Sequence, residues 1–323
     1  MNTTDLEHQF PTVTVGTLNK DGIQRLRISI PTIQKIEYPN LEFLVVDGRS
    51  TDGSIEYLQQ FSNIRIVTLE GIFSVTKGRN RLFHEAKSPY VFMVDNDIEI
   101  IDPQLLKKLL ERYRQHPDLA FLSPLVLDAD TEMLSEVGLS HTRIQRKQPL
   151  SRVLGHGLVV VSGYYGNCVL FRTKLLEDLG AHDERYPYHN NDYDLGARAY
   201  LKGFRVMIET DQYVIHHGYA ARVQLAPVAW RYQYHLSSMC RIICKNYCFK
   251  NLLIWLPTTI GWTFFKALRL SVMNQSVRPL FSTCKSLYFF LRDLPDTWQM
   301  RKRIQQERVA REDSFLKIPP ARF

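Results

Sequence analysis

The stretch "YVFMVDNDIEI", residues 90–100, places two acidic side chains directly after a short apolar run. Residues 90–94 are all aromatic or aliphatic, a pattern typical of a strand that is buried on both faces. Asp95, Asn96 and Asp97 follow without a break. Strands of this kind belong to sheets covered by helices on both sides, and ligands bind beyond the carboxyl ends of such strands. The stretch therefore predicts an α/β fold with polar groups at its ligand-binding edge.

Three interpretations compete for these polar residues: a plain turn, a calcium loop, and a metal site for a phosphorylated substrate. A calcium loop of the EF-hand type requires Gly at its sixth position and Glu at its twelfth. Those positions hold Ile100 and Leu106, which excludes the calcium loop. The turn and the metal site both stay open, because paired carboxylates at a strand end suit Mg²⁺ or Mn²⁺ bridging a diphosphate.

The surrounding sequence alternates between strand-like and helix-like segments. Strands are expected at 12–18, 41–47, 63–69, 90–95, 119–127, 167–172 and 204–209, and helices at 21–37, 53–61, 74–87, 103–116, 173–180 and 191–202. Asp102 and Pro103 would form the N-cap and first residue of the fourth helix. Residues 128–165 are expected to form loops and short strands. Strands separated by helices predict parallel βαβ units with right-handed crossovers.

The charge of the chain is unevenly distributed. Of 323 residues 45% are hydrophobic and 23% charged, which is typical of a folded globular protein. The net charge is +8, yet residues 241–323 alone hold 15 Lys and Arg against 5 Asp and Glu. This local excess favours an anionic partner surface. Phospholipid is the expected partner and nucleic acid is not, because the basic tail at 300–313 is typical of a solvated helix.

The most apolar segment lies inside this basic region, at 252–273. Pro257 and Gly261 interrupt it, and its apolar run is shorter than the about 20 residues that span a bilayer. Trp255 and Trp262 are suited to anchoring a helix in a membrane surface. Two interpretations stay open: a helix lying on the membrane, or one packed on the rest of the protein.

The N-terminal stretch and the cysteines indicate in which cellular compartment the protein is expected. "MNTTDLEHQFPTVTV" has no basic segment followed by an apolar one, so no secretory signal is expected there. The cysteine count is five, an odd number that argues against a complete set of disulfides. We expect a cytoplasmic protein with free thiols, bound peripherally to the inner face of the cell membrane through residues 241–311.

Ordered blocks spanning roughly residues 12–220 resemble the inverting glycosyltransferases of family 2, including rhamnosyltransferase-like, non-processive members. The blocks are "VTVGTLNKDGIQRLRISIPTI" (13–33), "YPNLEFLVVDGRSTDGSIEYL" (38–58), "TKGRNRLFHEAKSPYVFMVDND" (76–97), "GYYGNCVLFRTKLLEDLGAHDERYPYHNNDYDLGARAYLKGFRV" (163–206) and "YVIHH" (213–217). Each motif is loose, and their shared order makes the resemblance specific.

The resemblance implies a GT-A nucleotide-diphospho-sugar transferase fold, a mostly parallel sheet flanked by helices, with a C-terminal helical extension. The catalytic domain would span 1–225, with a donor half at about 10–127 and an acceptor half at about 160–220. Residues 226–323 would form the helical, basic region.

The resemblance also implies roles for single residues. Donor-binding residues would be Thr17, Asn19, Asp47, Arg79, Asp95 and Asn96. Asp97 would be the direct ligand of Mg²⁺ or Mn²⁺, with Asp95 beside it, and His216 or else His217 would complete the site. Asp192 would be the general base. Two positions depart from the family: Asn191 replaces a usual Glu, and Leu18 replaces a common aromatic residue.

The expected glycosyl transfer needs carboxylates for two separate tasks, to act as a base and to bind a cation. A base must take the proton of the acceptor hydroxyl, and a cation must stabilise the departing diphosphate. Asp192 and Asp194 lie two residues apart at an expected helix start, so they cannot face the same way. We expect Asp192 to enter the site and Asp194 to contact neighbouring loops.

The expected function is transfer of a hexosyl or deoxyhexosyl group from a nucleotide sugar to a lipid-linked or polysaccharide acceptor, with inversion, in cell-surface polysaccharide biosynthesis. Two alternatives are a nucleotidyltransferase of related architecture and an inactive glycan-binding homologue. The first would need a Gly-rich phosphate loop after the first strand, of which "GTLNKDG" is a poor version. An inactive glycan-binding homologue would not need the carboxylates of Asp95, Asp97 and Asp192.

Overall fold

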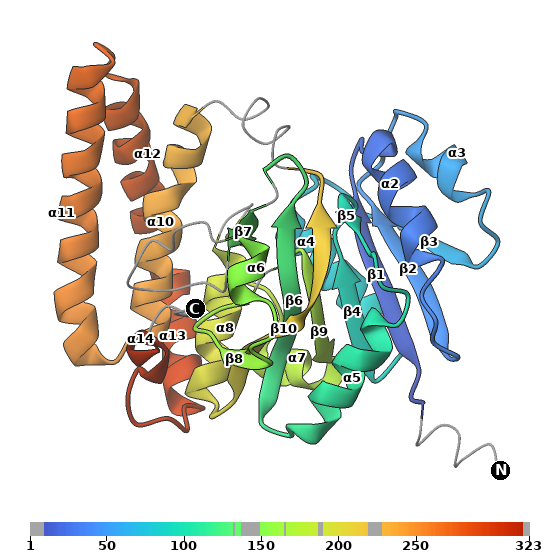
Figure 1. Ribbon diagram of the computed structural model, residues 1–323. Coiled ribbons are helices and arrows are strands. Elements are labelled where there is room, and N and C mark those ends of the chain that lie inside the picture. The colour runs from blue at the N-terminus through green and yellow to red at the C-terminus, as the bar shows by residue number, and fades with distance from the viewer. Residues whose placement is uncertain are drawn as a thin grey trace.

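The computed structural model describes residues 10–131, 133–136, 149–164, 166–186, 190–218 and 228–318. The strands are β1 (Val13–Asn19), β2 (Leu41–Asp47), β3 (Ile64–Thr68), β4 (Tyr90–Val94), β5 (Ile98–Glu99), β6 (Leu119–Asp128), β7 (Leu134–Glu136), β8 (Leu158–Val160), β9 (Cys168–Arg172) and β10 (Arg205–His216). The helices are α2 (Ile23–Ile33), α3 (Ser54–Leu58), α4 (Val75–Glu85), α5 (Leu105–Gln115), α6 (Leu150–Val153), α7 (Thr173–Leu179), α8 (Asn191–Leu201), α10 (Val228–Asn246), α11 (Phe249–Met273), α12 (Arg278–Arg292), α13 (Leu294–Gln306) and α14 (Ser314–Lys317). Figure 1 shows the strands gathered into one sheet, with α10 to α13 standing together beside it.

The sheet is mixed, with the strand order β3-β2-β1-β4-β9-β6-β10-β5; β7 pairs with β6, and β8 with β10. Neighbouring strands from β3 to β4 run parallel, and so do β6 and β10. Strand β9 lies antiparallel between β4 and β6. The expected α/β sheet flanked by helices is confirmed, but it is mixed and not mostly parallel. Strands β1 to β4 are parallel to one another because α2, α3 and α4 each return the chain to the same edge before the next strand begins.

Strand β4 is buried on both faces, as its apolar run predicts. Phe92 and Val94 belong to a hydrophobic cluster with α2 and α5, whereas Val91 and Met93 belong to another with α4, α7 and α8. None of the four is more than 1% exposed. The apolar run therefore ends where the chain leaves the core and reaches the carboxyl edge of the sheet.

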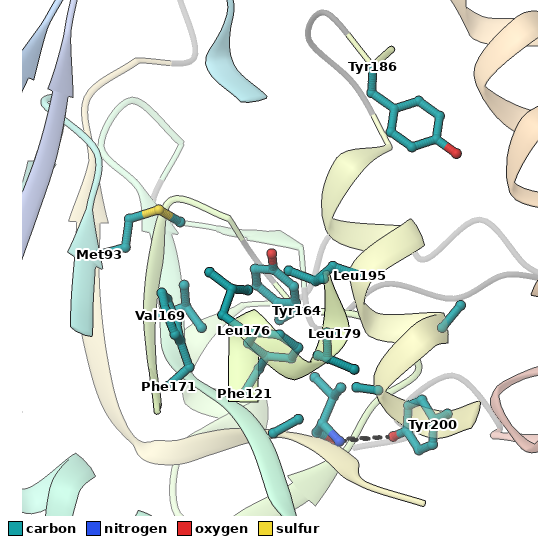
Figure 2. Close-up of a cluster of buried hydrophobic side chains, with 14 of the residues drawn as sticks. Met93, Phe121, Tyr164, Val169, Phe171, Leu176, Leu179, Tyr186, Leu195 and Tyr200 are labelled. Carbon is teal, nitrogen blue, oxygen red and sulfur yellow. Dashed lines mark hydrogen bonds between the residues drawn. The ribbon is translucent and has the colours of Figure 1, made fainter. Parts of the chain in front are cut away.

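The second of these clusters continues into the C-terminal helices. Figure 2 shows its central part, where the rings of Phe121 and Tyr164 stack with 4.3 Å between their centroids. Leu236, Phe290 and Phe315 belong to the same cluster. The expected C-terminal helical extension is confirmed, and it shares a core with the sheet.

The expected division between domains 1–225 and 226–323 falls within residues 219–227, which lie outside the described part of the chain. The assignment of two domains with that boundary stays a prediction.

Several expected boundaries differ from the structure. The helices expected at 21–37 and 53–61 are shorter, at Ile23–Ile33 and Ser54–Leu58. Helix α5 begins at Leu105, so the N-cap expected at Asp102 is wrong. The Asp102 carboxylate accepts a hydrogen bond from the Gln104 amide at 2.9 Å and holds a turn there instead. The strand expected at 204–209 runs on to His216, because an irregularity after Glu209 keeps β10 paired with β6.

Helix α11 contains the apolar segment 252–273. Its side chains Leu252, Thr263 and Ala267 are buried, while large apolar side chains on other sides of the helix are exposed. Both interpretations of this segment stay open, since one face is packed and another is free. Among the residues that the structure describes, no helix is long and apolar enough to cross a membrane.

Candidate active site

The carboxyl ends of β1, β2 and β4 bring together three of the expected donor-binding residues. The Asn19 side-chain amide donates to Asp47 Oδ2 at 2.8 Å and to Ser50 Oγ at 3.1 Å. The Asn96 amide donates to Asn19 Oδ1 at 2.8 Å. Thr17, buried on β1, lies on the same face of that strand as Asn19. The polar residues predicted at three strand ends thus form one hydrogen-bonded row.

Asp47 is held rigidly within this row. Its carboxylate accepts hydrogen bonds from the Ser50 amide and the Ser50 hydroxyl, both at 2.7 Å, besides the one from Asn19. Asp47 itself is fully buried. Ser50 was not among the predicted site residues, although its spacing of three residues from an Asp at a strand end is typical of a side-chain-closed turn. Contact of Asp47 with the donor stays a prediction.

Asp97 and His216 meet through the pairing of β5 with β10. His216 lies opposite Ile98 in this antiparallel pair, and the His217 amide donates to the Asp97 carbonyl at 2.9 Å. This register places His216 Nε2 3.3 Å from Asp97 Oδ1. Both side chains are almost fully buried.

The same pairing distinguishes the two histidines. His217 Nε2 lies 2.7 Å from Glu99 Oε2, and the His217 side chain is 27% exposed. His217 therefore points to the opposite side of the strand, toward a surface carboxylate. Of the two histidines, His216 is therefore the one that could hold a metal together with Asp97.

The surroundings of Asp97 and His216 fit a hard divalent cation. Neither ring nitrogen of His216 has a hydrogen-bond partner in the described structure, although both are buried. A Cβ built on Gly218 would lie 2.1 Å from Asp97 Oδ2 and 2.9 Å from His216 Nε2, so a residue larger than glycine would displace these atoms. No group of three or more His, Cys, Asp or Glu is placed to hold a metal within the described ranges. Mg²⁺ is commonly bound by one or two protein ligands together with substrate phosphates, which this pair allows.

Arg79 lies between the expected donor half and the expected acceptor half of the sheet edge. Its guanidinium donates to Asn191 Oδ1 at 2.7 Å and to the Gly166 carbonyl at 2.5 Å, and lies 3.7 Å from Asp95. Arg79 is only 4% exposed. We expected Arg79 to contact the nucleotide, but its guanidinium is bound to other groups of the protein. Through these contacts Arg79 joins the end of β4 to the start of α8. Asn191 accepts this hydrogen bond at the position where the family usually has Glu.

Asp192 occupies the first turn of α8, and its Oδ1 accepts a hydrogen bond from the Tyr193 amide at 3.0 Å. The loss of hydration in this crowded position raises the pKa of Asp192 above its ordinary value; Arg79 opposes the shift and Asp95 adds to it. A raised pKa makes the carboxylate a stronger base.

Asp194 faces away from Asp192 and is fully buried. It lies 2.9 Å from Lys245 Nζ and 2.9 Å from Arg198. The expected difference in direction between the two acids is therefore confirmed. The partners of Asp194 include the loop residue Tyr186, whose hydroxyl donates to Asp194 Oδ1 at 3.3 Å. They also include the helix residues Arg198 and Lys245, which we did not expect.

The strand order and the distribution of polar residues at its edge define an α/β protein of the GT-A type. The family model described as glycosyl transferase family 2 matches residues 12–180. The chain belongs to this family, as its motifs imply.

One relative is the O-antigen biosynthesis protein RfbC of Myxococcus xanthus, which is 27% identical over 231 residues. The match covers 66% of this chain and 18% of RfbC, so the chain spans only a small part of that relative's length.

Solved structures have a similar fold. Residues 1–349 of TarS from S. aureus, in complex with UDP-GlcNAc, match with a TM-score of 0.60 and 15% identity, over 95% of this chain and 90% of that one. The mannosyltransferase PcManGT from Pyrobaculum calidifontis, in complex with GDP-Man and Mn²⁺, matches with a TM-score of 0.55 and 17% identity, over 92% and 86%. At these identities the likeness establishes the fold alone.

Proposed function

We propose that the protein is a metal-dependent, inverting glycosyltransferase. It moves a sugar from a nucleoside diphosphate donor to a hydroxyl group of a lipid-linked or polysaccharide acceptor. The observation that carries this proposal is the Arg79 bridge, which holds the Asp95 end of β4 and the Asp192 end of α8 at one edge of the sheet. The family membership and the name of the relative RfbC support it.

In the proposed reaction Asp192 removes the proton of the acceptor hydroxyl. The acceptor oxygen then forms a bond to the anomeric carbon while the bond from that carbon to the diphosphate breaks, which inverts the configuration. Asp97 and His216 would hold the divalent cation, which supplies positive charge to the leaving diphosphate. Product NMR that finds a retained configuration would contradict the proposed mechanism.

A donor panel tests the function directly. We expect UDP, TDP or GDP to raise the melting temperature more in the presence of Mn²⁺ than in its absence, because the cation would join the diphosphate to Asp97 and His216. At a ligand concentration about 100 times Kd, binding adds about 2.7 kcal/mol to the free energy of unfolding. The measurement is a thermal-shift series with each nucleotide, with Mn²⁺ and with EDTA. If no nucleotide stabilises the protein, the transferase proposal is wrong.

We further propose that the protein binds an anionic membrane peripherally through α11 and α12. Ile254, Phe265, Leu268 and Val272 are exposed and recur at helical spacing on the side of α11 opposite the buried Leu252. Other exposed apolar residues lie on and before α12: Val277, Phe281, Tyr288 and Leu291. Exposed basic residues on the two helices are Lys250, Lys266, Arg269, Arg278, Lys285 and Arg292. This combination is typical of helices lying on anionic lipid.

Vesicle binding tests this surface. We expect cosedimentation with phosphatidylcholine vesicles that contain phosphatidylglycerol, and little with phosphatidylcholine alone. Phe265→Ser with Leu268→Ser should weaken binding by at least about tenfold, because burying one such side chain is worth about 1.5–3 kcal/mol. Ile72→Ser is the matched control, since Ile72 is 85% exposed and lies outside the C-terminal helices. Equal binding of wild type and double variant would contradict the proposal.

A further inference from the structure

A buried cluster of charged side chains connects α8 with α10 and α13. Asp183 and Lys245 are both fully or almost fully buried, as is Asp194. Lys245 Nζ lies 2.5 Å from Asp183 Oδ2 and 2.9 Å from Asp194 Oδ1. Arg241 Nε donates to Asp183 at 2.7 Å and, from the same guanidinium, Nη1 donates to the Thr297 hydroxyl of α13 at 2.5 Å.

Lys245 thus binds the chain on both sides of the proposed base. Asp183 precedes Asp192 in the sequence and Asp194 follows it, so one ammonium group of α10 links the two flanks. The Lys245 ammonium also lies 4.8 Å from the centre of the Tyr186 ring. Asn246, the neighbour of Lys245, donates to Asp194 Oδ1 at 2.9 Å.

Arg198 strengthens the same link from within α8. Its guanidinium pairs with Asp194 at 2.9 Å and donates to the Ala181 carbonyl at 2.7 Å, besides a hydrogen bond to the Leu179 carbonyl. The chain before the base and the helix that carries it are therefore tied to each other, and both are tied to α10.

The two carboxylates of the cluster stay ionised at neutral pH, and they oppose the lowering of the Lys245 pKa by burial. Burial alone would raise the pKa of Asp183, but Lys245 and Arg241 outweigh it and hold that pKa well below the ordinary range. Burial likewise opposes the ionised form of Asp194, and Lys245 and Arg198 again lower its pKa. Both carboxylates are therefore ionised beside the buried cations.

Stability alone is a weak reason for such a cluster. Moving an ion into a protein interior costs several kcal/mol, and well-packed apolar groups often replace a buried ion pair without loss of stability. Buried charged pairs do fix the geometry of the segments that carry them, because each charged group finds its hydrogen-bond partners in only one arrangement. The location beside Asp192 suggests that geometry is what this cluster contributes.

We propose that Lys245 is a positioning residue that fixes Asp192, and that α10 therefore belongs to the catalytic apparatus. This inference rests on the proposed transferase function, in which Asp192 is the base. The C-terminal helical region would then serve catalysis in addition to its proposed membrane contact.

Amide hydrogen exchange tests the structural part without any substrate. In Lys245→Met, an apolar replacement of similar length, we expect exchange in α8 to rise by at least about tenfold while β1 and β4 keep their protection. Lys174→Met is the control, because Lys174 is 76% exposed and pairs only with the surface residues Glu177 and Asp178 among the ion pairs of the described chain. Unchanged exchange in α8, or an equal rise throughout the sheet, would overturn the inference.

Kinetics test the catalytic part. The probe is hydrolysis of the nucleotide sugar whose nucleotide stabilises the protein most, with water as the acceptor. We expect Lys245→Met to lower kcat by about 10- to 100-fold with the KM for the donor unchanged, because a small displacement of a catalytic group is costly.

A charge-compensated variant separates positioning from stability. Lys245→Met with Asp183→Asn removes one charge of each sign, and it should recover the melting temperature but not kcat. Recovery of kcat together with stability would overturn the positioning role. An inactive wild-type protein would instead contradict the transferase function, and hydrogen exchange would still decide whether Lys245 orders α8.

Discussion

Replacement of Asp192 by Asn is expected to lower kcat by about 10²- to 10⁴-fold, the usual contribution of a general base. The amide has nearly the same shape as the carboxylate, and its oxygen can keep the hydrogen bond from the Tyr193 amide. Nucleotide affinity should stay unchanged, since the proposed donor contacts, on β1, β2, α4 and directly after β4, do not include Asp192. Steady-state transfer rates and calorimetric binding of the nucleotide measure the two quantities separately.

Asp178→Asn is the matched control, because Asp178 lies on α7 and its side chain is 55% exposed. It should keep full activity. If Asp192→Asn retains the wild-type rate, another group must act as the base.

The pH dependence of Asp192 follows from the direction of its pKa shift. Burial favours the neutral carboxylic acid, so the rate should fall as the pH drops through a pKa above 3.8, the ordinary value. The same shift means that ionising Asp192 costs stability in the folded state at pH values above 3.8. Asp192→Asn should therefore raise the melting temperature at pH 7, with the gain disappearing in acid. A higher melting temperature combined with lost activity would be the signature of a functional carboxylate.

Replacement of Gly218 by Ala is expected to abolish metal-dependent donor binding almost as completely as Asp97→Ala. The added Cβ would lie 2.1 Å from Asp97 Oδ2 and 2.9 Å from His216 Nε2, so one of these ligands must move. Displacing a ligand by changing a supporting residue typically lowers metal affinity by about 10- to 100-fold. Calorimetric titration of Mn²⁺ in the presence of the stabilising nucleotide measures the loss.

Gly261→Ala is the control for this substitution, since a Cβ at Gly261 meets no atom within 4 Å. Wild-type metal affinity in Gly218→Ala would mean that the cation does not bind between Asp97 and His216. Metal binding that survives Asp97→Ala would exclude that carboxylate as a ligand.

The sequence by itself predicted the fold and the polar edge of the sheet. Its signals are local: apolar runs of strand length, helix-length segments between them, and acids where the runs end. Because parallel strands end at one edge, Asp47 and Asp95 could be placed together without coordinates. The resemblance to the family, and not strand position, implied the roles of Asp97 and Asp192.

Only the tertiary structure decided which side chains meet. The pairing of β5 with β10 distinguished His216 from His217, and side-chain packing turned Arg79 toward Asn191. Helical periodicity could not reveal which face of α11 is packed, since apolar residues occupy more than one face. The link from Lys245 to Asp183 and Asp194 had no local signal either, because its members are distant in sequence and a lone lysine carries no pattern. Periodicity is a property of neighbours along the chain, whereas contacts between distant segments depend on how the whole core packs.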